Sequence, residues 1–289
     1  IRLVCKFKGI PLIDWTIGVM GPETGLKWAI RKFYLKWCKA HLLYGEFARD
    51  WYINHGFKEE ACFVVRNSLD FEKQVAGRDS LTAEDVVRVR EEFGVDNPEA
   101  RLLVHPGRVE LKKNLPLLFE AMQILKGKGR KLKLLLIGKG REEEVLRKLA
   151  KDLGLEEEIV FFGECYEEEK IGLLFTASDL TVVPGVTGLI AMHSLVYGTP
   201  ILTRYNTAYA HGPEVEAVVE GKTGGYFEDG NVEDLVEKME YLLYEEPCKP
   251  RMTDACKAMI EGEFNPAYQE KIVIKALNYV LPADKQIPL

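Results

Sequence analysis

Residues 179–203 read DLTVVPGVTGLIAMHSLVYGTPILT, and their pattern is the most informative one about the fold. Its first five residues form an apolar run of strand length, and a glycine-bearing loop follows them. We expect a helix to begin near Thr187 and to stop at Gly198, where Pro200 opens a second apolar strand. The order strand, helix, strand indicates a parallel sheet with a crossover helix.

The same alternation of apolar strands and helices continues along the whole chain. The strand-like runs are 10–15, 41–44, 62–66, 101–105, 132–137, 158–162, 179–183 and 199–203, and the amphipathic stretches include 115–127, 141–152, 167–177 and 231–243. Strands that are apolar throughout and separated by helices belong to parallel sheets covered on both faces. The predicted fold class is therefore α/β.

A polar connection divides the chain. The stretch 71–98 is charged, holds one expected short helix starting near Ser80 and ends in an Asn-Pro turn. Three strand runs precede it, and a complete α/β unit follows it. The expected parts are a partial N-terminal Rossmann-like domain (1–75), an interdomain linker helix (76–98), a C-terminal Rossmann-like domain (99–262) and a C-terminal segment (263–289) whose helix, at about 266–281, packs back on the first domain.

Composition excludes several classes of protein. The net charge is −6, and only residues 1–70 are basic, with 11 Lys/Arg against 7 Asp/Glu, so no nucleic-acid partner is expected. The six cysteines are scattered without zinc spacing, which predicts reduced thiols and no metal site. No run approaches the ~18 apolar residues of a membrane-spanning helix. We expect a cytoplasmic protein.

The turn after residues 101–105 reads HPGRVELKKN, from His105 to Asn114. Ligands of open parallel sheets bind beyond the carboxyl ends of the strands. Gly107 would let the backbone approach a ligand, while Arg108 and Lys113 supply an arginine fork and a lysine point charge that suit a diphosphate. On spacing alone, a solvated basic loop fits equally well.

The loop 184–188 precedes the helix expected at Thr187, and a helix start favours phosphate. His193 lies about two turns into that helix, where a lone histidine is more often packed in the core than bound to a ligand. The loops 137–140 (IGKG) and 220–227 (EGKTGGYF) are each weak evidence and indicate tight turns.

Taken in order, these segments resemble a known family. The succession GR(x)4K, IGKG, FFGE, SDLTVVPG, YGTPI and EGKTGGYF is similar to the donor domain of the family 4 (group 1) glycosyltransferases, over roughly 99–245. Upstream, WTIG, GLK, LLYGEFA and VVRNSLD are similar to bacterial members that build surface polysaccharides. The resemblance implies a GT-B-like fold of two Rossmann-like parallel-sheet domains, the first incomplete because part of the acceptor domain is absent upstream.

The resemblance also implies roles for individual residues. Arg108 and Lys113 would be catalytic, binding the donor diphosphate and stabilising the leaving phosphate. The implied donor-binding residues are Gly107, Lys139, Glu164, Cys165, Tyr166, Gly185, Val186, Thr187, Gly188, His193 and Glu214. The implied reaction moves a sugar, with retention and without metal or cofactor, from a nucleoside-diphosphate sugar to a saccharide acceptor that is expected to be lipid-linked.

The chain departs from the family pattern at three positions. The family usually has two glutamates eight residues apart where this chain has Gly185 and His193, and relatives tend to have a histidine in place of Ile17. We interpret the pair as subfamily chemistry in which His193 hydrogen-bonds a ribose hydroxyl. The departures keep open a non-catalytic nucleotide-sugar-binding module. A sugar-nucleotide epimerase of the same fold would need further acid/base carboxylates, which are not evident.

Residues 25–40, GLKWAIRKFYLKWCKA, form a basic segment without an acid. At 100° per residue, one side holds Leu26, Ala29, Ile30, Phe33 and Trp37 and is expected to pack on the sheet. The other side holds Lys27, Trp28, Arg31, Lys32, Leu35 and Lys39 and is expected to lie on an anionic membrane surface at the inner face of the membrane. An ordinary docked helix with a charged outer side also fits.

Overall fold

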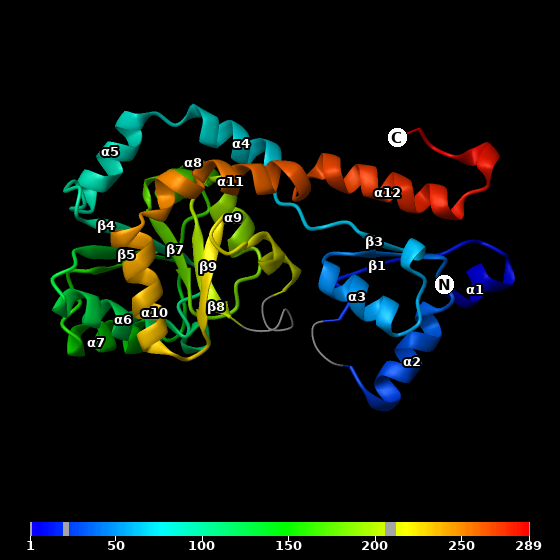
Figure 1. Ribbon diagram of the computed structural model, residues 1–289, viewed down its shortest axis with the longest axis horizontal. Helices are drawn as coiled ribbons and strands as arrows, with labels where there is room; N and C mark the ends of the chain where they lie inside the picture. The colour runs from blue at the N-terminus through cyan, green and yellow to red at the C-terminus, as the bar shows by residue number, and fades with distance from the viewer. Residues whose placement is uncertain (1, 20–22, 206–211, 289) are drawn as a thin grey trace. The chain divides into compact units, whose positions relative to one another are not determined.

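The computed structural model describes residues 2–19, 23–205 and 212–288, and the chain forms two compact units (Figure 1). The first unit comprises residues 1–69, 207–216 and 262–289, and the second comprises 70–206 and 217–261. The stretch 71–98 therefore falls within the second unit, and the C-terminal segment falls within the first.

The first unit is built on a three-stranded parallel sheet in the order β1-β2-β3. Its strands are β1 (Ile13–Thr16), β2 (Ala40–Leu43) and β3 (Cys62–Val64), and its helices are α1 (Arg2–Phe7), α2 (Gly25–Leu35), α3 (Glu46–Asn54) and α12 (Pro266–Val280). Successive strand residues face opposite sides of a sheet. Leu43 accordingly joins a core with Trp28 and Tyr52, while Leu42 joins another with Val65 and Ala276.

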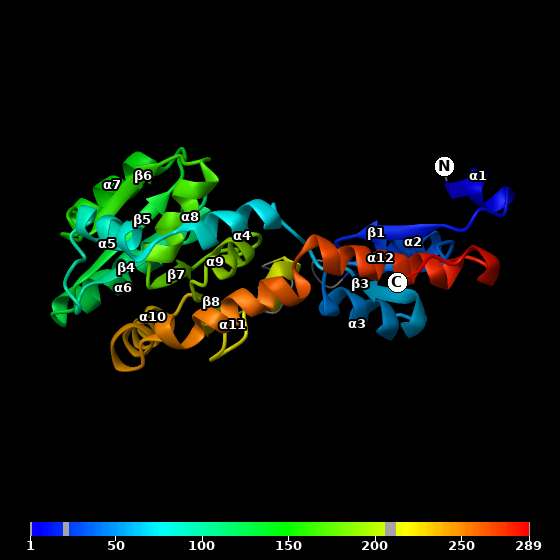
Figure 2. The same ribbon diagram turned by 90° about the horizontal axis from the view of Figure 1, so that it is seen from above.

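Helix α12 covers the second of these cores. It contacts β2 and β3, and Ala276 is fully buried against Leu42 and Val65. Figure 2 shows α12 running alongside the three strands of the first unit. The helix forms because Asn265 caps it, accepting a hydrogen bond from the Tyr268 amide at 2.9 Å, and because Pro266 occupies its first turn.

The two sides of α2 are the reverse of those that its sequence pattern predicts. Trp28 and Leu35 are buried, and the Trp28 ring contacts the rings of Trp51 and His55 at centroid distances of 6.1 and 5.2 Å. The side assigned to the sheet faces outward, where Leu26 and Phe33 are 76 % and 57 % exposed. Both sides carry large apolar residues, so helical periodicity does not show which side is buried. The side that carries Trp28 is buried because Trp28 packs against the aromatic cluster on and after α3.

The basic residues of α2 and the turn after it also divide differently from expectation. Arg31 is bound within the unit, to the Glu23 carboxylate at 2.5 Å and the Gly18 carbonyl oxygen at 2.6 Å. Lys27 and Lys39 are exposed, and Lys32 is half-buried. The membrane-facing set predicted from the sequence is therefore wrong in Trp28, Arg31 and Leu35.

The second unit contains a six-stranded parallel sheet in the order β6-β5-β4-β7-β8-β9. Its strands are β4 (Arg101–Pro106), β5 (Leu132–Ile137), β6 (Ile159–Gly163), β7 (Leu180–Val183), β8 (Ile201–Tyr205) and β9 (Gly224–Glu228). The chain winds outward from β4 in one direction and from β7 in the other. A doubly wound sheet binds its ligands where the order reverses, beyond the carboxyl ends of β4 and β7.

Helices cover both faces of this sheet (Figure 1). They are α4 (Phe71–Ser80), α5 (Ala83–Glu92), α6 (Leu115–Gly127), α7 (Glu143–Asp152), α8 (Glu168–Ala177), α9 (Ile190–Val196), α10 (Val232–Glu240) and α11 (Cys248–Glu263). Helix α6 packs on α7 and α10, whereas α4 and α5 pack on α8. Consecutive residues of the central strand, Leu102, Leu103 and Val104, are all fully buried, which confirms the predicted α/β class.

The stretch predicted to be a linker with one helix instead contributes two helices to the second unit. Thr82 starts the second of these helices, because its hydroxyl accepts a hydrogen bond from the Asp85 amide while the Asp85 carboxylate accepts one from the Thr82 amide. Arg90 of α5 then bonds Asp179 at 3.0 Å and the Ala177 carbonyl at 2.9 Å. These contacts fix the segment against α8 and the start of β7.

Candidate active site

Three loops meet at the carboxyl ends of β4, β5 and β6. The Gly107 amide donates to the Ile137 carbonyl at 2.8 Å, and the Gly138 amide donates to the Gly163 carbonyl at 2.7 Å. A Cβ atom at Gly138 would lie 2.1 Å from the Gly107 carbonyl oxygen, and Gly138 has a φ of +140°. Only glycine permits this approach, so IGKG is a packing requirement of the site and not merely a turn.

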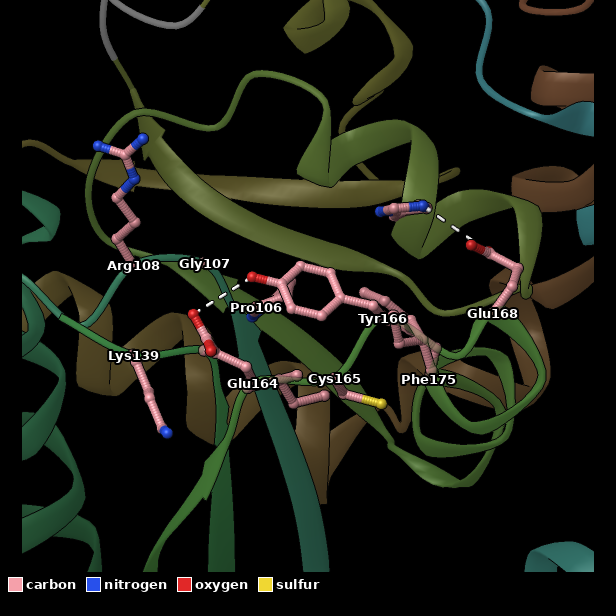
Figure 3. Close-up of a pocket in the computed structure, with 13 residues that line it drawn as sticks. Pro106, Gly107, Arg108, Lys139, Glu164, Cys165, Tyr166, Glu168 and Phe175 are labelled. Carbon is pink, nitrogen blue, oxygen red and sulfur yellow. Dashed lines mark hydrogen bonds and ion pairs between the residues drawn. The ribbon is translucent and has the colours of Figure 1, made fainter.

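A cavity of about 490 Å³ opens at this edge of the sheet (Figure 3). That volume is within the usual range for a small-ligand site. Of the residues predicted from the sequence, those lining it are Gly107, Arg108, Lys139, Glu164, Cys165, Tyr166 and His193. They come from separate segments of the chain, and the doubly wound topology brings them together.

Arg108 and Lys113 provide positive charge beside the cavity. Arg108 lines it and is exposed, while the Lys113 ammonium donates to the Val186 carbonyl oxygen at 3.4 Å. Within the described ranges, no carboxylate lies in ion-pair contact with either side chain. Burial, with the nearby Lys112 charge, lowers the pKa of Lys113 from its usual value. A bound anion would relieve that cost.

The loop from Gly185 to Gly188 packs against the segment that carries Lys113. A Cβ atom at Gly185 would stand 2.8 to 2.9 Å from backbone atoms of Lys113, so the loop leaves no room for a side chain there. The glutamate that the family resemblance would place at this position is therefore excluded by close backbone packing. Lys113 and this loop adjoin each other rather than lining the cavity itself.

The helix after this loop begins later than the sequence indicates. Helix α9 starts at Ile190, not near Thr187, and Gly188 has a positive φ of +51°. The Thr187 hydroxyl is buried and bonds the Thr203 hydroxyl at 2.7 Å, so it anchors the loop to β8. The amides of Val186, Gly188 and Leu189 donate to no backbone carbonyl in the described part of the chain.

Tyr166 lies across the middle of the cavity. Figure 3 shows its ring between the Arg108 end and the Glu168 end, and its hydroxyl donates to the Glu164 carboxylate at 3.2 Å. The ring is 83 % exposed. The negative charge of Glu164 raises the pKa of the Tyr166 phenol. A flat, exposed ring at a cavity mouth is suited to contact with a planar base.

The opposite end of the cavity holds a residue that the sequence pattern did not single out. Glu168, the first residue of α8, lines the cavity, and its carboxylate lies 3.7 Å from His193 Nε2. Burial lowers the pKa of His193, and the Glu168 charge opposes that shift. The acidic run EEE at 167–169 could have signalled it, but such a run is also ordinary in the first turn of a helix.

Glu214 is not brought to the cavity. Its side chain is buried in the first unit, where it accepts a hydrogen bond from Asn67 Nδ2 at 2.8 Å. This carboxylate therefore has a structural partner within the first unit, and its contact with a donor stays a prediction.

The family assignment follows from comparison with known proteins. The family model described as Glycosyl transferases group 1 matches residues 90–261, more than half of the chain, and these residues contain every segment that lines the cavity. The chain belongs to the group 1 glycosyltransferases.

Individual relatives agree with this assignment. This group 1 glycosyltransferase is 26 % identical over 167 residues to an uncharacterized glycosyltransferase of Haemophilus influenzae, covering 56 % of this chain and 45 % of that protein. It is 31 % identical over 156 residues to the sulfoquinovosyl transferase SQD2 of Arabidopsis thaliana, covering 51 % of this chain and 28 % of that protein. The chain thus spans less than half the length of these curated relatives.

A solved structure extends the likeness to nearly the whole chain. The Anabaena protein Alr3699/HepE in complex with UDP superposes with a TM-score of 0.75 at 17 % identity, covering 96 % of this chain and 74 % of that one. This likeness shows the GT-B glycosyltransferase fold of this group 1 enzyme.

Two kinds of feature are absent from the described residues. No group of three or more His, Cys, Asp or Glu side chains there is arranged to hold a metal ion. Among the same residues, no helix combines the length and the apolar character that crossing a membrane requires. None of the six cysteines of this group 1 glycosyltransferase forms a disulfide.

Proposed function

We propose that this protein transfers a sugar from a nucleoside-diphosphate sugar to a saccharide acceptor, with retention and without a metal ion. One observation carries the proposal. The cations Arg108 and Lys113 lack described acidic partners and stand at the switch point of the doubly wound sheet, beside a nucleotide-sized cavity. Family membership and the UDP bound to the Anabaena neighbour support a nucleotide-sugar donor.

In this proposal the bond between the anomeric carbon and the diphosphate breaks as negative charge develops on the departing phosphate. Arg108, Lys113 and the backbone amides of Val186, Gly188 and Leu189 hold that charge. Fixed donors aimed at developing charge typically contribute about 3–4 kcal/mol each to transition-state stabilisation. The acceptor hydroxyl then attacks the anomeric carbon from the face that the diphosphate leaves, and its proton passes to the departing phosphate oxygen. Two cations in place of a metal suffice for this chemistry.

The test is transfer from a panel of UDP-, GDP- and dTDP-sugars to saccharide acceptors, followed by ¹H NMR of the product. We expect turnover with one donor class, retention at the anomeric carbon, and no loss of rate with EDTA. Hydrolysis of the donor counts as turnover. Inversion, or inhibition by EDTA that a divalent cation restores, would contradict the corresponding part of the proposal.

A second function is a nucleotide-sugar-binding module without catalysis. The close packing of Gly185 on the Lys113 backbone favours this function. Because there is no room for a side chain at position 185, no side chain at this position can bind the sugar. Saturable binding of a nucleoside diphosphate without turnover of any donor in the panel would decide for the module.

We also propose that the outer side of α2 attaches the protein to an anionic membrane at its cytoplasmic face, near a lipid-linked acceptor. Leu26, Ile30 and Phe33 are 76 %, 50 % and 57 % exposed along one side of the helix. Lys27 and Lys36 are exposed too, and at 100° per residue they flank this apolar side. An apolar strip bordered by cations matches the boundary between anionic headgroups and acyl chains.

Sedimentation with vesicles tests this attachment. The protein should bind vesicles containing phosphatidylglycerol at low salt and leave neutral phosphatidylcholine vesicles unbound. Phe33→Glu should lower binding roughly tenfold, since burial of one such side chain is worth about 1.5–3 kcal/mol. Val145→Glu on α7 is the matched control, because Val145 is 56 % exposed. If the protein does not bind vesicles but forms a dimer that Phe33→Glu disrupts, the outer side of α2 contacts a second copy of the chain and not a membrane.

A further inference from the structure

A second cavity, of about 470 Å³, lies in the first unit at the amino ends of β2 and β3. The residues that line it come from the turns before these two strands, from the beginning of β2 and from the end of α12. Three of them are Lys36, Lys39 and Lys58, and we call this cavity the lysine pocket. It shares no residue with the cavity beside Arg108. Its size suits a small ligand.

The positive charge of the lysine pocket is not neutralised by the protein. No acidic residue of the described chain lines the pocket. Lys36 and Lys39 are exposed, and neither has a carboxylate in ion-pair contact within the described ranges. Lys58 contacts Glu60 at 3.7 Å, but these two side chains are 76 % and 61 % exposed, so the pair contributes little.

A cavity at the amino edge of the second unit's sheet provides a comparison. It measures about 480 Å³ and is also lined by basic residues, but Glu158 lines it as well. Lys126 contacts the Glu158 carboxylate at 2.6 Å, and Arg130 contacts Glu240 at 2.8 Å. The protein itself therefore supplies the counter-charge of that cavity, which it does not do for the lysine pocket.

Helix dipoles account for only part of the charge in the lysine pocket. Helices α2, α3 and α12 end beside it, and a helix end favours cations because it carries the equivalent of about half a negative charge. Three lysine side chains exceed what three such ends offset. A surplus of positive charge is left for a ligand.

The walls of the lysine pocket include fixed aromatic rings. His41 lines the pocket, is 2 % exposed, and packs edge-on against the Phe57 ring with centroids 5.0 Å apart. Tyr279 of α12 also lines it, and its ring packs on Phe63 at a centroid distance of 5.8 Å. Rings held by the core of the unit, next to three cations, suit an anion that carries an organic group.

We propose that the lysine pocket binds a phosphate ester. The lysine ammonium groups, each with three donors, bond the phosphate oxygens, while the organic group of the ester lies against Phe57 and Tyr279. A free phosphate ester and the headgroup of an anionic phospholipid share this chemistry. Lys36 also borders the outer apolar side of α2, so the lipid source, but not the pocket itself, rests on the proposed membrane attachment.

Two half-buried cysteines report on the two cavities separately. Cys38 lines the lysine pocket, and Cys165 lines the cavity beside Arg108. Labelling by N-ethylmaleimide, followed for each cysteine by peptide mass spectrometry, should slow severalfold at Cys38 when sn-glycerol 3-phosphate is added, and should not change at Cys165. UDP should protect Cys165 and not Cys38. Cys5 on α1 lines neither cavity and is the internal reference.

Paired substitutions test the lysines. The double variant Lys36→Ala, Lys39→Ala should raise the concentration of ester that gives half-protection of Cys38 roughly tenfold, because it removes charged donors to the phosphate. The matched control is Lys27→Ala, Lys32→Ala, which removes two charges from the same helix without touching the pocket lining and should stay within about twofold of wild type. Calorimetric titration of the same proteins measures the affinity independently of the thiol.

Vesicles at low salt identify the source of the phosphate. Protection of Cys38 by phosphatidylglycerol vesicles and not by phosphatidylcholine vesicles, with loss of protection in the Lys36→Ala, Lys39→Ala variant, would assign the pocket to a lipid headgroup. Protection by the soluble ester alone would assign it to a free phosphate ester.

Other outcomes would overturn the inference. These are failure of both the ester and the anionic vesicles to protect Cys38, equal losses in the two double variants, or equal protection by acetate at the same concentration, which would show a response to general charge. Failure of UDP to protect Cys165 would count against the proposed donor site and would leave the lysine pocket standing.

Discussion

Arg108 and Lys113 follow β4. We expect both side chains to contribute to transfer, by stabilising negative charge on the diphosphate, and to contribute little to the stability of the fold. Arg108→Ala and Lys113→Ala should each lower kcat/KM for the donor sugar nucleotide by about 100-fold, the typical effect of removing one fixed donor to a developing oxyanion. Neither side chain has a described acidic partner, so the free energy of unfolding should change by no more than about 0.5 kcal/mol. Steady-state kinetics and urea unfolding measure the two effects.

Lys112→Ala is the control for these substitutions. Lys112 is next to Lys113, its side chain is 62 % exposed, and its ammonium pairs with Glu110 at 2.6 Å. Its removal should leave donor kinetics within about twofold of wild type, the range of a screened surface charge. Equal losses from Lys112 and Lys113 would mean that the loop attracts donors by general charge only.

His105, at the end of β4, makes stability depend on pH. Its Nδ1 bonds the Val182 carbonyl oxygen at 2.8 Å, and its Nε2 has no hydrogen-bond partner among the described residues. Burial lowers the pKa of His105 from 6.5 to about 4. The unfolded chain therefore takes up a proton at higher pH than the folded chain, and the free energy of unfolding falls as the pH drops through this window.

The variant His105→Asn tests this dependence, because its amide can still donate to Val182. Between pH 7 and pH 4.5 the wild-type protein should lose about 2 kcal/mol more stability than the variant, measured by urea unfolding at each pH. Parallel loss in both proteins would assign the acid sensitivity to other groups, such as His193.

The loops between elements require glycine where backbones nearly touch. Gly185→Ala should destabilise the second unit by about 1–3 kcal/mol, because its Cβ would press on the Lys113 backbone. The displaced lysine should also weaken nucleoside-diphosphate binding. Thermal unfolding and calorimetric titration measure these effects on one sample.

Gly77→Ala provides the comparison for that substitution. Gly77 lies inside α4, and a Cβ atom at this position would meet nothing within 4 Å, so alanine should stabilise the protein by about 0.5–1 kcal/mol. Should Gly185→Ala behave like Gly77→Ala, the loop would have room to move, and Lys113 would not be held by it.

The local sequence pattern was sufficient to predict the elements that build the cavity. Runs such as 132–137 are apolar except for one lysine, and the glycines at 107, 138 and 163 mark the strand ends, so the sequence indicated both the sheet and the edge at which the cavity lies. The inward side of α2 was not predictable, because Trp28 packs on residues from another helix. Glu168 was missed for the same reason: its partners Gln74 and Tyr197 are remote in sequence.

The two units of the molecule have separate hydrophobic cores, so we expect them to unfold separately. Ala276→Asp would place a charge in the fully buried contact of α12 with Leu42 and Val65, destabilising the first unit by about 3 kcal/mol or more. The proposed nucleotide site lies in the second unit, so nucleotide binding should persist. Denaturant unfolding followed by tryptophan fluorescence reports the first unit, since all four tryptophans lie in it.

Parallel loss of nucleotide affinity in Ala276→Asp would show that the two units unfold as one. An exposed alanine on α2, Ala29, offers the matched substitution Ala29→Asp, which should leave both the unfolding transition and the nucleotide affinity near their wild-type values.

The position of α12 in the chain has a consequence for biosynthesis. This helix completes the sheet of the first unit, yet every strand of the second unit precedes it in the sequence. A polypeptide emerging from the ribosome can therefore fold its second unit before α12 is available to cover β2 and β3. The order of maturation is the reverse of the order of translation, and the earliest-made strands are the ones exposed longest to chaperones and proteases.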